Sequence, residues 1–262
     1  MRSGKILFFD IDGTLYREGR GMPGSTREAI LRCADRGHTL MLCTGRGASS
    51  IPEVIRQLPF DGGVFGCGTY VTTGEKVLVD AAVMGPRCQE IIDALYENRC
   101  PFFINNSDYI YYDPAYIPAG FEEIIQRMKY DYEGRLRPLS ELDGRISKMT
   151  AYPDDPSLVP RIIQRVSPWF DVLEHREYPY IELLLKGHTK GTGTELILNS
   201  LGIPKENSYG FGDSANDIPL LEATGHGVIM GDAPEEIKGR FLRAEAFGDD
   251  GLARILEELG LI

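Results

Sequence analysis

The sequence lacks paired cysteines, long apolar runs and an excess of positive charge. Its five cysteines are odd in number and no two stand at C-x-x-C spacing, which argues against a zinc site or a dithiol redox pair. Cys33, Cys43 and Cys100 stand in or beside apolar runs, so we expect buried free thiols in a reducing compartment. No run reaches the length of a signal sequence or a membrane span, and we therefore expect a cytoplasmic protein.

Acidic residues outnumber basic ones, and the formal net charge is −11. Nucleic acids and anionic membranes would repel such a chain, so neither is expected as a main partner. The composition, 42% hydrophobic and 26% charged, fits a soluble globular protein with a substantial core. A length of 262 residues accommodates one large domain or two modest ones.

Short apolar runs alternate with helical patterns at both ends of the chain, which predicts a parallel sheet with right-handed crossovers. The first helix is expected from about Ser25, because Ser25 and Glu28 have the spacing of a capping box. The main elements expected at the two ends are strands over 5–9, 38–43, 62–66, 208–211 and 228–230, and helices over 25–37, 48–58, 192–201, 218–223, 235–238 and 252–259.

This rhythm breaks after a hairpin expected at Gly74-Glu75. Residues from about 84 to 180 carry their own mixed helices and strands, enough for a small α/β layer. Helices are expected there over 87–98, 116–128 and 157–166, and strands over 101–105, 109–112, 146–152, 169–175 and 180–185. The simplest organisation is an α/β core made from residues 1–83 and 186–262, interrupted by an inserted α/β domain over 84–185.

Two carboxylates follow the first apolar strand, in the string Asp10-Ile11-Asp12-Gly13-Thr14. Ligands of an open parallel sheet bind beyond the carboxyl ends of its strands, and a turn at Gly13 lets both acids face one cleft. Carboxylates this close repel each other unless a cation or proton lies between them. Mg²⁺, which prefers oxygen ligands, is the expected cofactor.

Two further strings could hold a phosphate. Thr44-Gly45-Arg46 follows another apolar strand, where a hydroxyl and backbone N–H groups offer an anion site, although threonine there is equally typical of a plain cap. Lys186 and Lys190 flank the return to the core, and either could neutralise a phosphoryl oxygen or simply be a solvated surface charge.

The last string is Gly212-Asp213-Ser214-Ala215-Asn216-Asp217, between an apolar strand and a helix. A helix cap explains one of its acids but not the run. If Asp213 converges on Asp10 and Asp12, the three acids complete a magnesium site that takes one phosphate oxygen.

The order D-x-D-G-T, T-G-R, K-G and G-D-x-x-N-D resembles the haloacid dehalogenase superfamily, and the large insertion resembles its Cof-type capped branch. The resemblance spans nearly the whole chain. It implies a Rossmann-like doubly wound core, a mobile cap and hydrolysis of phosphate esters. The core motifs are intact, but Cys67-Gly68 stands where the family often has Asn-Gly, and Gly231-Asp232-Ala233 replaces a Gly-Asn-Ala pattern.

The resemblance also implies roles for individual residues. Asp10 would be the nucleophile and Asp12 the general acid and base. Thr44, Gly45, Lys190 and Asn216 would bind the phosphoryl group, and Lys190 is preferred to Lys186 because Lys190-Gly191 opens a helix. Asp10, Asp12 and Asp213 would bind Mg²⁺, with Asp217 behind them.

The function expected is a magnesium-dependent phosphatase that acts on sugar phosphates or cofactor phosphates through an aspartyl-phosphate. Two alternatives use the same residues: a phosphosugar mutase or phosphotransferase, and a non-catalytic module that binds a phosphometabolite. The partner expected in each case is a small phosphorylated metabolite. The chain could act as a monomer or a homodimer.

Overall fold

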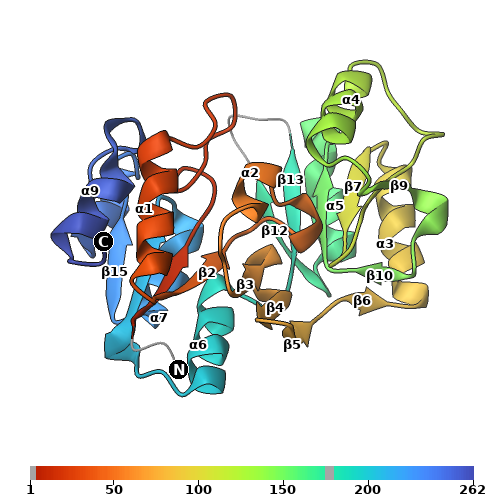
Figure 1. The fold of residues 1–262 in the computed structure, drawn as a ribbon. Coiled ribbons are helices and arrows are strands. Elements are labelled where there is room, and N and C mark those ends of the chain that lie inside the picture. The colour runs from red at the N-terminus through yellow and green to blue at the C-terminus, as the bar shows by residue number, and fades with distance from the viewer. Residues whose placement is uncertain (1–3, 175–179) are drawn as a thin grey trace. The chain divides into compact units, whose positions relative to one another are not determined.

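A computed structural model describes residues 4–174 and 180–262 (Figure 1). The described residues divide into two compact units. The first, called the core unit, is drawn from Met1–Gly45, Val54–Val79 and Thr189–Ile262; the second, called the inserted unit, is drawn from Arg46–Glu53 and Asp80–His188. The core unit thus combines segments from both ends of the chain, whereas most of the inserted unit is one continuous segment.

The core unit is built on an eight-stranded sheet in the order β16-β15-β14-β1-β2-β3-β4-β5. Its strands are β1 (Ile6–Phe9), β2 (Thr39–Cys43), β3 (Gly62–Phe65), β4 (Tyr70–Thr73), β5 (Lys76–Asp80), β14 (Ser208–Gly212), β15 (His226–Ile229) and β16 (Leu242–Arg243). The six strands from β16 to β3 are parallel, and β4 pairs antiparallel with β3. This confirms the doubly wound parallel core.

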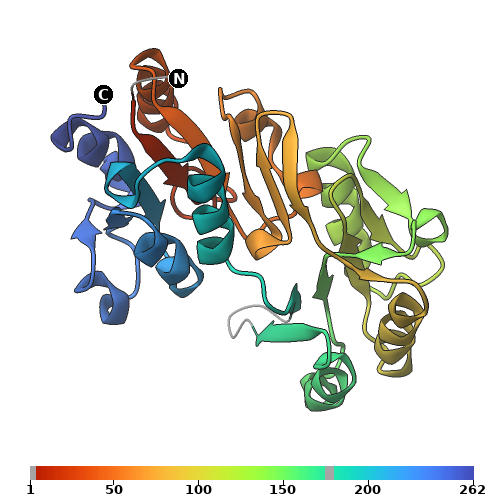
Figure 2. The same ribbon diagram turned by 90° about the horizontal axis from the view of Figure 1, so that it is seen from below.

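Helices cover both faces of this sheet, because successive side chains of a strand point to opposite sides. Ile6 and Phe8 of β1 pack with residues of α6 and α7 on one face. On the other face α1 and α9 lie side by side (Figures 1 and 2). The helices are α1 (Gly24–Asp35), α2 (Glu53–Arg56), α6 (Lys190–Leu201), α7 (Ile218–Ala223), α8 (Glu235–Lys238) and α9 (Gly251–Glu258).

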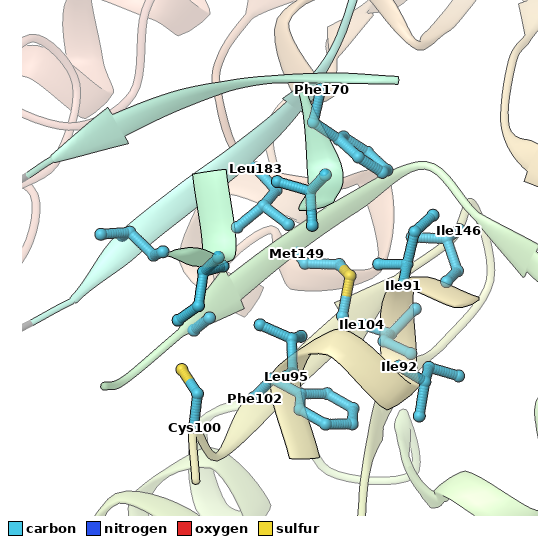
Figure 3. Packing of buried hydrophobic residues seen from close by; sticks show 14 of the residues in the cluster. Ile91, Ile92, Leu95, Cys100, Phe102, Ile104, Ile146, Met149, Phe170 and Leu183 are labelled. Atoms are coloured by element: carbon cyan, nitrogen blue, oxygen red, sulfur yellow. The ribbon is translucent and has the colours of Figure 1, made fainter. Parts of the chain in front are cut away.

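The inserted unit contains a six-stranded sheet in the order β12-β13-β11-β7-β8-β9. Its strands are β7 (Phe102–Asn105), β8 (Ile110–Tyr112), β9 (Leu136–Pro138), β11 (Lys148–Ala151), β12 (Phe170–Glu174) and β13 (Ile181–Leu185), and the short strands β6 (Val83–Met84) and β10 (Arg145–Ile146) pair separately. Helices α3 (Pro86–Glu97) and α5 (Val159–Val166) pack on one face around Met149 and Leu183 (Figure 3). Helix α4 (Phe121–Asp131) packs against Phe103 on the other.

Four points of local structure differ from what the sequence analysis anticipates. The helix over 48–58 is a 3-10 turn at Ala48–Ser50 followed by the single turn of α2, because Pro52 has no N–H to continue a helix. Helix α4 begins at Phe121, after Pro118 and Gly120, and not at Tyr116. The short strands β9 and β16 were not anticipated, since neither has an apolar run.

The fourth correction concerns the start of α1. Pro23 stands at its N-cap, without a side-chain cap, and the Ser25 hydroxyl instead donates to an Asp250 carboxylate oxygen 2.5 Å away. The capping box predicted there is therefore absent. A strand expected over 169–175 runs to Glu174 as β12, and His175 lies outside the described residues.

The five cysteines are buried free thiols, as expected. None of the helices in the described part of the chain combines the length and apolar character that crossing a bilayer requires.

Candidate active site

The carboxyl ends of β1 and β14 lie side by side in the sheet, with Phe9 paired to Phe211. Asp10 directly follows β1, and its backbone N–H donates to the Phe211 carbonyl over 2.9 Å. From these two strands the chain turns in opposite directions, to β2 and to β15. Such a switch point opens a crevice beyond the strand ends, where open α/β sheets bind ligands.

Three acids converge at this crevice. Asp10, Asp213 and Asp217 each offer a carboxylate oxygen, and these oxygens lie within 4.8 Å of one another. Asp10 and Asp217 are buried and Asp213 is partly buried. Three carboxylates gathered in a place with little water need positive charge between them to stay ionised.

Lys190 supplies part of that charge. It is the first residue of α6, and its side chain is 1% exposed. Its ammonium donates to Asp10 Oδ1 over 2.7 Å, to Asp217 Oδ1 over 2.5 Å and to Asn216 Oδ1 over 3.1 Å. Burial opposes the charge on Lys190, but the two carboxylates outweigh it and raise the pKa of Lys190 well above its usual value. Lys186, the other candidate, is exposed.

Both carboxylate oxygens of Asp217 accept hydrogen bonds from other groups of the protein. Its Oδ2 accepts from the backbone N–H groups of Asp213 and Ser214, each over 3.0 Å, and Oδ1 accepts from Lys190. This carboxylate therefore fixes the turn that carries Asp213 and anchors the lysine. Such saturation suits a role behind the metal ligands better than a role as a ligand.

Asp213 is arranged differently. Its Oδ1 is buried and has no hydrogen-bond partner in the part of the chain that the structure describes. The carboxylate presses against Gly13, whose φ is +88° and where an added Cβ would lie 2.0 Å from Asp213 Oδ2. Burial, and after it the charge of Asp217, raise the pKa of Asp213 to about 7. A buried polar atom without a partner calls for an explanation, and a bound ion beside Asp10 is the one that fits three neighbouring carboxylates.

The same causes act on Asp10. Burial and then the neighbouring Asp217 raise its pKa well above the ordinary value, while Lys190 opposes the rise. A divalent cation at this point would add to the opposing charge and favour the ionised form. The donor set at the crevice, carboxylate oxygens with one of them unpartnered, fits Mg²⁺.

Asp12 stands apart from the buried cluster. Its side chain is exposed and it begins a short hairpin, in which Asp12 and Tyr16 form a β-bridge. The next residue is Gly13, and the Asp213 carboxylate rests against it. The main chain at Asp12 therefore lies beside that carboxylate, although the two aspartates are far apart in the sequence. The role of Asp12 as a metal ligand stays a prediction.

Thr44 and Gly45 follow β2 at the same edge of the sheet. Thr44 is fully buried, and its N–H donates to the Val64 carbonyl. A Cβ on Gly45 would lie 3.8 Å from the Asn216 side-chain nitrogen and 3.5 Å from Cys67 Sγ. The structure therefore brings the threonine string, Asn216 and Lys190 to the end of the sheet that holds the acids.

Comparison with known proteins identifies the family. Residues 7–243 match the model of the haloacid dehalogenase-like hydrolases, and the chain belongs to this family. Among its relatives are the Bacillus subtilis 5-amino-6-(5-phospho-D-ribitylamino)uracil phosphatase YitU, 26% identical over 97% of this chain and 96% of that protein, and the Escherichia coli pyridoxal phosphate phosphatase YbhA, 25% identical over 90% and 91%.

A solved structure agrees with these relatives. A sugar phosphatase of haloacid dehalogenase subclass IIB superposes with a TM-score of 0.78 at 26% identity, covering 98% of this chain and all of that one. The resemblance seen in the motifs is thereby confirmed, as is the enzyme class expected from it, a hydrolase of phosphoric monoesters.

Two residues near the site were not foreseen as contributors. Arg17, in the hairpin that Asp12 begins, is ion-paired with Asp232 over 2.6 Å, and its charge reaches Asp213. The sequence signalled Asp232 only as a departure from the Gly-Asn-Ala pattern. Nothing in the local sequence pointed to Arg17, because its partner is more than 200 residues away.

Proposed function

We propose that this enzyme is a magnesium-dependent phosphatase that hydrolyses small phosphorylated metabolites through a phosphoryl group carried on Asp10. The observation that carries the proposal is the buried contact of Lys190 with Asp10 Oδ1 beside the unpartnered oxygen of Asp213. Lys190 holds one oxygen of Asp10 and so orients the carboxylate, whose other oxygen is the nucleophile. Asp10 and Asp213, with Asp12, would hold Mg²⁺.

The reaction is two successive displacements at phosphorus. In the first, an Asp10 oxygen forms a bond to phosphorus, the bond to the ester oxygen breaks, and Asp12 gives its proton to the departing alkoxide. In the second, Asp12 takes a proton from water, the water oxygen bonds to phosphorus, and the bond to Asp10 breaks. Covalent catalysis divides one difficult step into two easier ones.

Positive charge must meet the phosphoryl oxygens during both steps. Lys190 and the Thr44 hydroxyl are the groups of this chain suited to that task, with Asn216 holding the lysine through its side-chain oxygen. Bound Mg²⁺ supplies further charge to the phosphoryl oxygens. The Asp12 side chain is exposed, whereas Asp10 is buried.

The relatives suggest the substrate class. Their names include phosphatases of pyridoxal phosphate and of a ribitylamino uracil phosphate, and the solved neighbour is a sugar phosphatase. We therefore propose sugar phosphates or cofactor phosphates as substrates.

The test is phosphate release from an aryl phosphate and from a panel of metabolites, with Mg²⁺ and with a chelator. Asp10→Asn is expected to remove turnover while circular dichroism and the unfolding midpoint show a folded protein. The matched control is Asp35→Asn on the exposed side of α1, which should leave activity unchanged. Wild-type turnover by Asp10→Asn, with deamidation excluded by mass spectrometry, would refute the mechanism; isomerised sugar phosphate without free phosphate would indicate a mutase.

A further inference from the structure

The residue proposed as the general acid begins a hairpin whose near part is buried, at Thr14 and Leu15, and whose far part, from Arg17, is more exposed. Residues 12–21, called here the Asp12 hairpin, contain two isolated β-bridges, Asp12 with Tyr16 and Arg17 with Gly21. The backbone N–H of Gly13 donates to the Tyr16 carbonyl over 2.8 Å, and Arg17 and Gly21 exchange two further bonds. The N–H groups of Leu15 and Tyr16 also donate to the Ile11 carbonyl, over 2.9 and 2.8 Å, so backbone hydrogen bonds connect the neighbours of Asp12 to the start of the far part.

That far part is fastened to another segment of the core unit. Arg17 Nη2 donates to Asp232 Oδ2 over 2.6 Å, and the Arg17 guanidinium lies 4.8 Å from the centre of the Phe247 ring. Phe247 is buried, so the ring is a fixed surface. An arginine that is both ion-paired and stacked loses much of its freedom, which a lysine would keep.

The segment that receives Arg17 is itself well held. Next to Asp232, the Gly231 N–H donates to the Glu245 carbonyl, and the Ala233 N–H donates to the Met230 carbonyl. Met230 in turn donates to Gly212, beside the Asp213 turn. The hairpin that bears Asp12 is thus tied to a support that continues into the strand leading to the metal-binding acids.

A surface ion pair of this exposure contributes little to overall stability, so stability alone does not account for this arrangement. We propose that Arg17 is a positioning residue: by binding Asp232 and Phe247 it holds the Asp12 hairpin so that the Asp12 carboxyl is directed at the leaving oxygen. The inference rests on the proposed phosphatase function and assigns a residue that the shared motifs do not include.

Substrates whose leaving groups differ in basicity can distinguish a positioning role of Arg17 from a purely structural one. An alkoxide must receive a proton as it departs, whereas 4-nitrophenolate is stable without one, so a misplaced general acid slows alkyl esters far more than aryl esters. Turnover of the two esters is compared as kcat/KM, which reports the first displacement and not the later hydrolysis, in which Asp12 acts as a base for every substrate. In Arg17→Ala, kcat/KM for an alkyl phosphate should fall about tenfold, part of the about 10²–10⁴ that a general acid contributes. For 4-nitrophenyl phosphate we expect less than about a twofold change in kcat/KM, because departure of its leaving group does not need the proton.

The variants form a double-mutant cycle. Asp232→Ala should reproduce the alkyl-specific loss, and the double variant should be no worse than either single one. Arg17→Lys should recover part of the loss, because a single ammonium can still pair with Asp232. Arg20→Ala is the matched control, an arginine of the same hairpin outside the pair, and should leave the ratio of alkyl to aryl turnover unchanged.

All rates are measured at saturating Mg²⁺, since the charge of Arg17 also acts on Asp213. An equal loss of kcat/KM for both esters, a loss that additional Mg²⁺ restores, or additive effects of Arg17→Ala and Asp232→Ala would each overturn the positioning role. None of these results would touch the proposed phosphatase function, which fails if Asp10→Asn keeps its turnover or if the wild type isomerises sugar phosphates without releasing phosphate.

Discussion

The ammonium nitrogen of Lys190 lies 2.5 Å from a carboxylate oxygen of Asp217, and both side chains are closed to solvent. The same ammonium contacts Asp10, so one cation serves two buried acids. Lys190 therefore neutralises buried negative charge in the core unit at the same place as the candidate active site.

Lys190→Met should lower the free energy of unfolding by about 3–5 kcal/mol in metal-free buffer, because it leaves buried carboxylates without their counter-charge. The deficit should shrink as the pH falls, since protonation removes the unpaired charges. Urea unfolding at several pH values measures both effects. Lys186→Met is the control: that lysine is exposed and 3.9 Å from Asp171, so a change within about 0.5 kcal/mol is expected. Equal losses in the two variants would contradict the prediction.

Gly13→Ala should greatly weaken Mg²⁺ binding, because the new methyl group would lie 2.0 Å from Asp213 Oδ2 and would displace that carboxylate. Its positive φ of +88° adds backbone strain, which must be separated from the displacement. Gly19→Ala in the same hairpin provides that separation, since Gly19 has a φ of +76° but no atom within 4 Å of the added Cβ. Calorimetric titration with Mg²⁺ should show a loss in Gly13→Ala alone; similar affinities in the two variants would exclude the contact as its cause.

The affinity for Mg²⁺ should rise as the pH rises toward about 7. Burial, followed by the charge of Asp217, raises the pKa of Asp213 to about 7, so below that pH a proton occupies the carboxylate that the cation needs. The apparent affinity should fall about tenfold per pH unit below this point, and binding should release a proton. Titrations at about pH 6 and about pH 8, in buffers of different ionisation enthalpy, count that proton. An affinity independent of pH, or binding without proton release at the lower pH, would contradict this.

His38 should make the fold acid-sensitive. Its Nδ1 accepts from the Lys5 backbone N–H over 2.9 Å, which places the ring proton on Nε2, 3.1 Å from the Leu261 carbonyl. Burial lowers the pKa of His38, so the unfolded chain binds the proton more readily than the folded protein. The stability that the neutral ring contributes is present above about pH 6.5 and is lost as the pH falls below it, with a slope of at most about 1.4 kcal/mol per pH unit for one proton.

Comparison with His38→Gln isolates that contribution. The variant should be less stable at neutral pH, and its stability should fall less steeply between about pH 7 and about pH 5, because glutamine does not titrate. Chemical unfolding across this range gives both slopes. Parallel curves for the two proteins would assign the acid sensitivity to other groups.

Much of the candidate site could be predicted from the polar motifs that follow the strands, because the position of each motif depends on local chain geometry. Asp10 and Asp213 are each placed by the end of a buried apolar strand, and such strands are legible in the sequence. Their meeting could be expected because neighbouring parallel strands end at one edge. The contact of Lys190 with both Asp10 and Asp217 could not, since it depends on the packing of α6 beneath the sheet.

The failures have a common physical origin. Serine is a common N-cap residue, but the Ser25 hydroxyl donates instead to Asp250, which is 225 residues away in the sequence. The helix expected over 48–58 is interrupted at Pro52, because proline has no backbone N–H to donate to the preceding turn. Arg17 and Asp232 lie in irregular loops, where neither the periodicity of apolar residues nor the spacing of motifs indicates which residues form ion pairs.

The central position of β1 has a consequence for how the protein is made. Ile6 pairs with Ser208, so one side of this apolar strand has no neighbour until about 200 further residues have left the ribosome. At about 5–20 residues per second that interval lasts about 10–40 s. During translation one edge of this strand therefore stays without its native partner until about four fifths of the chain has been synthesised.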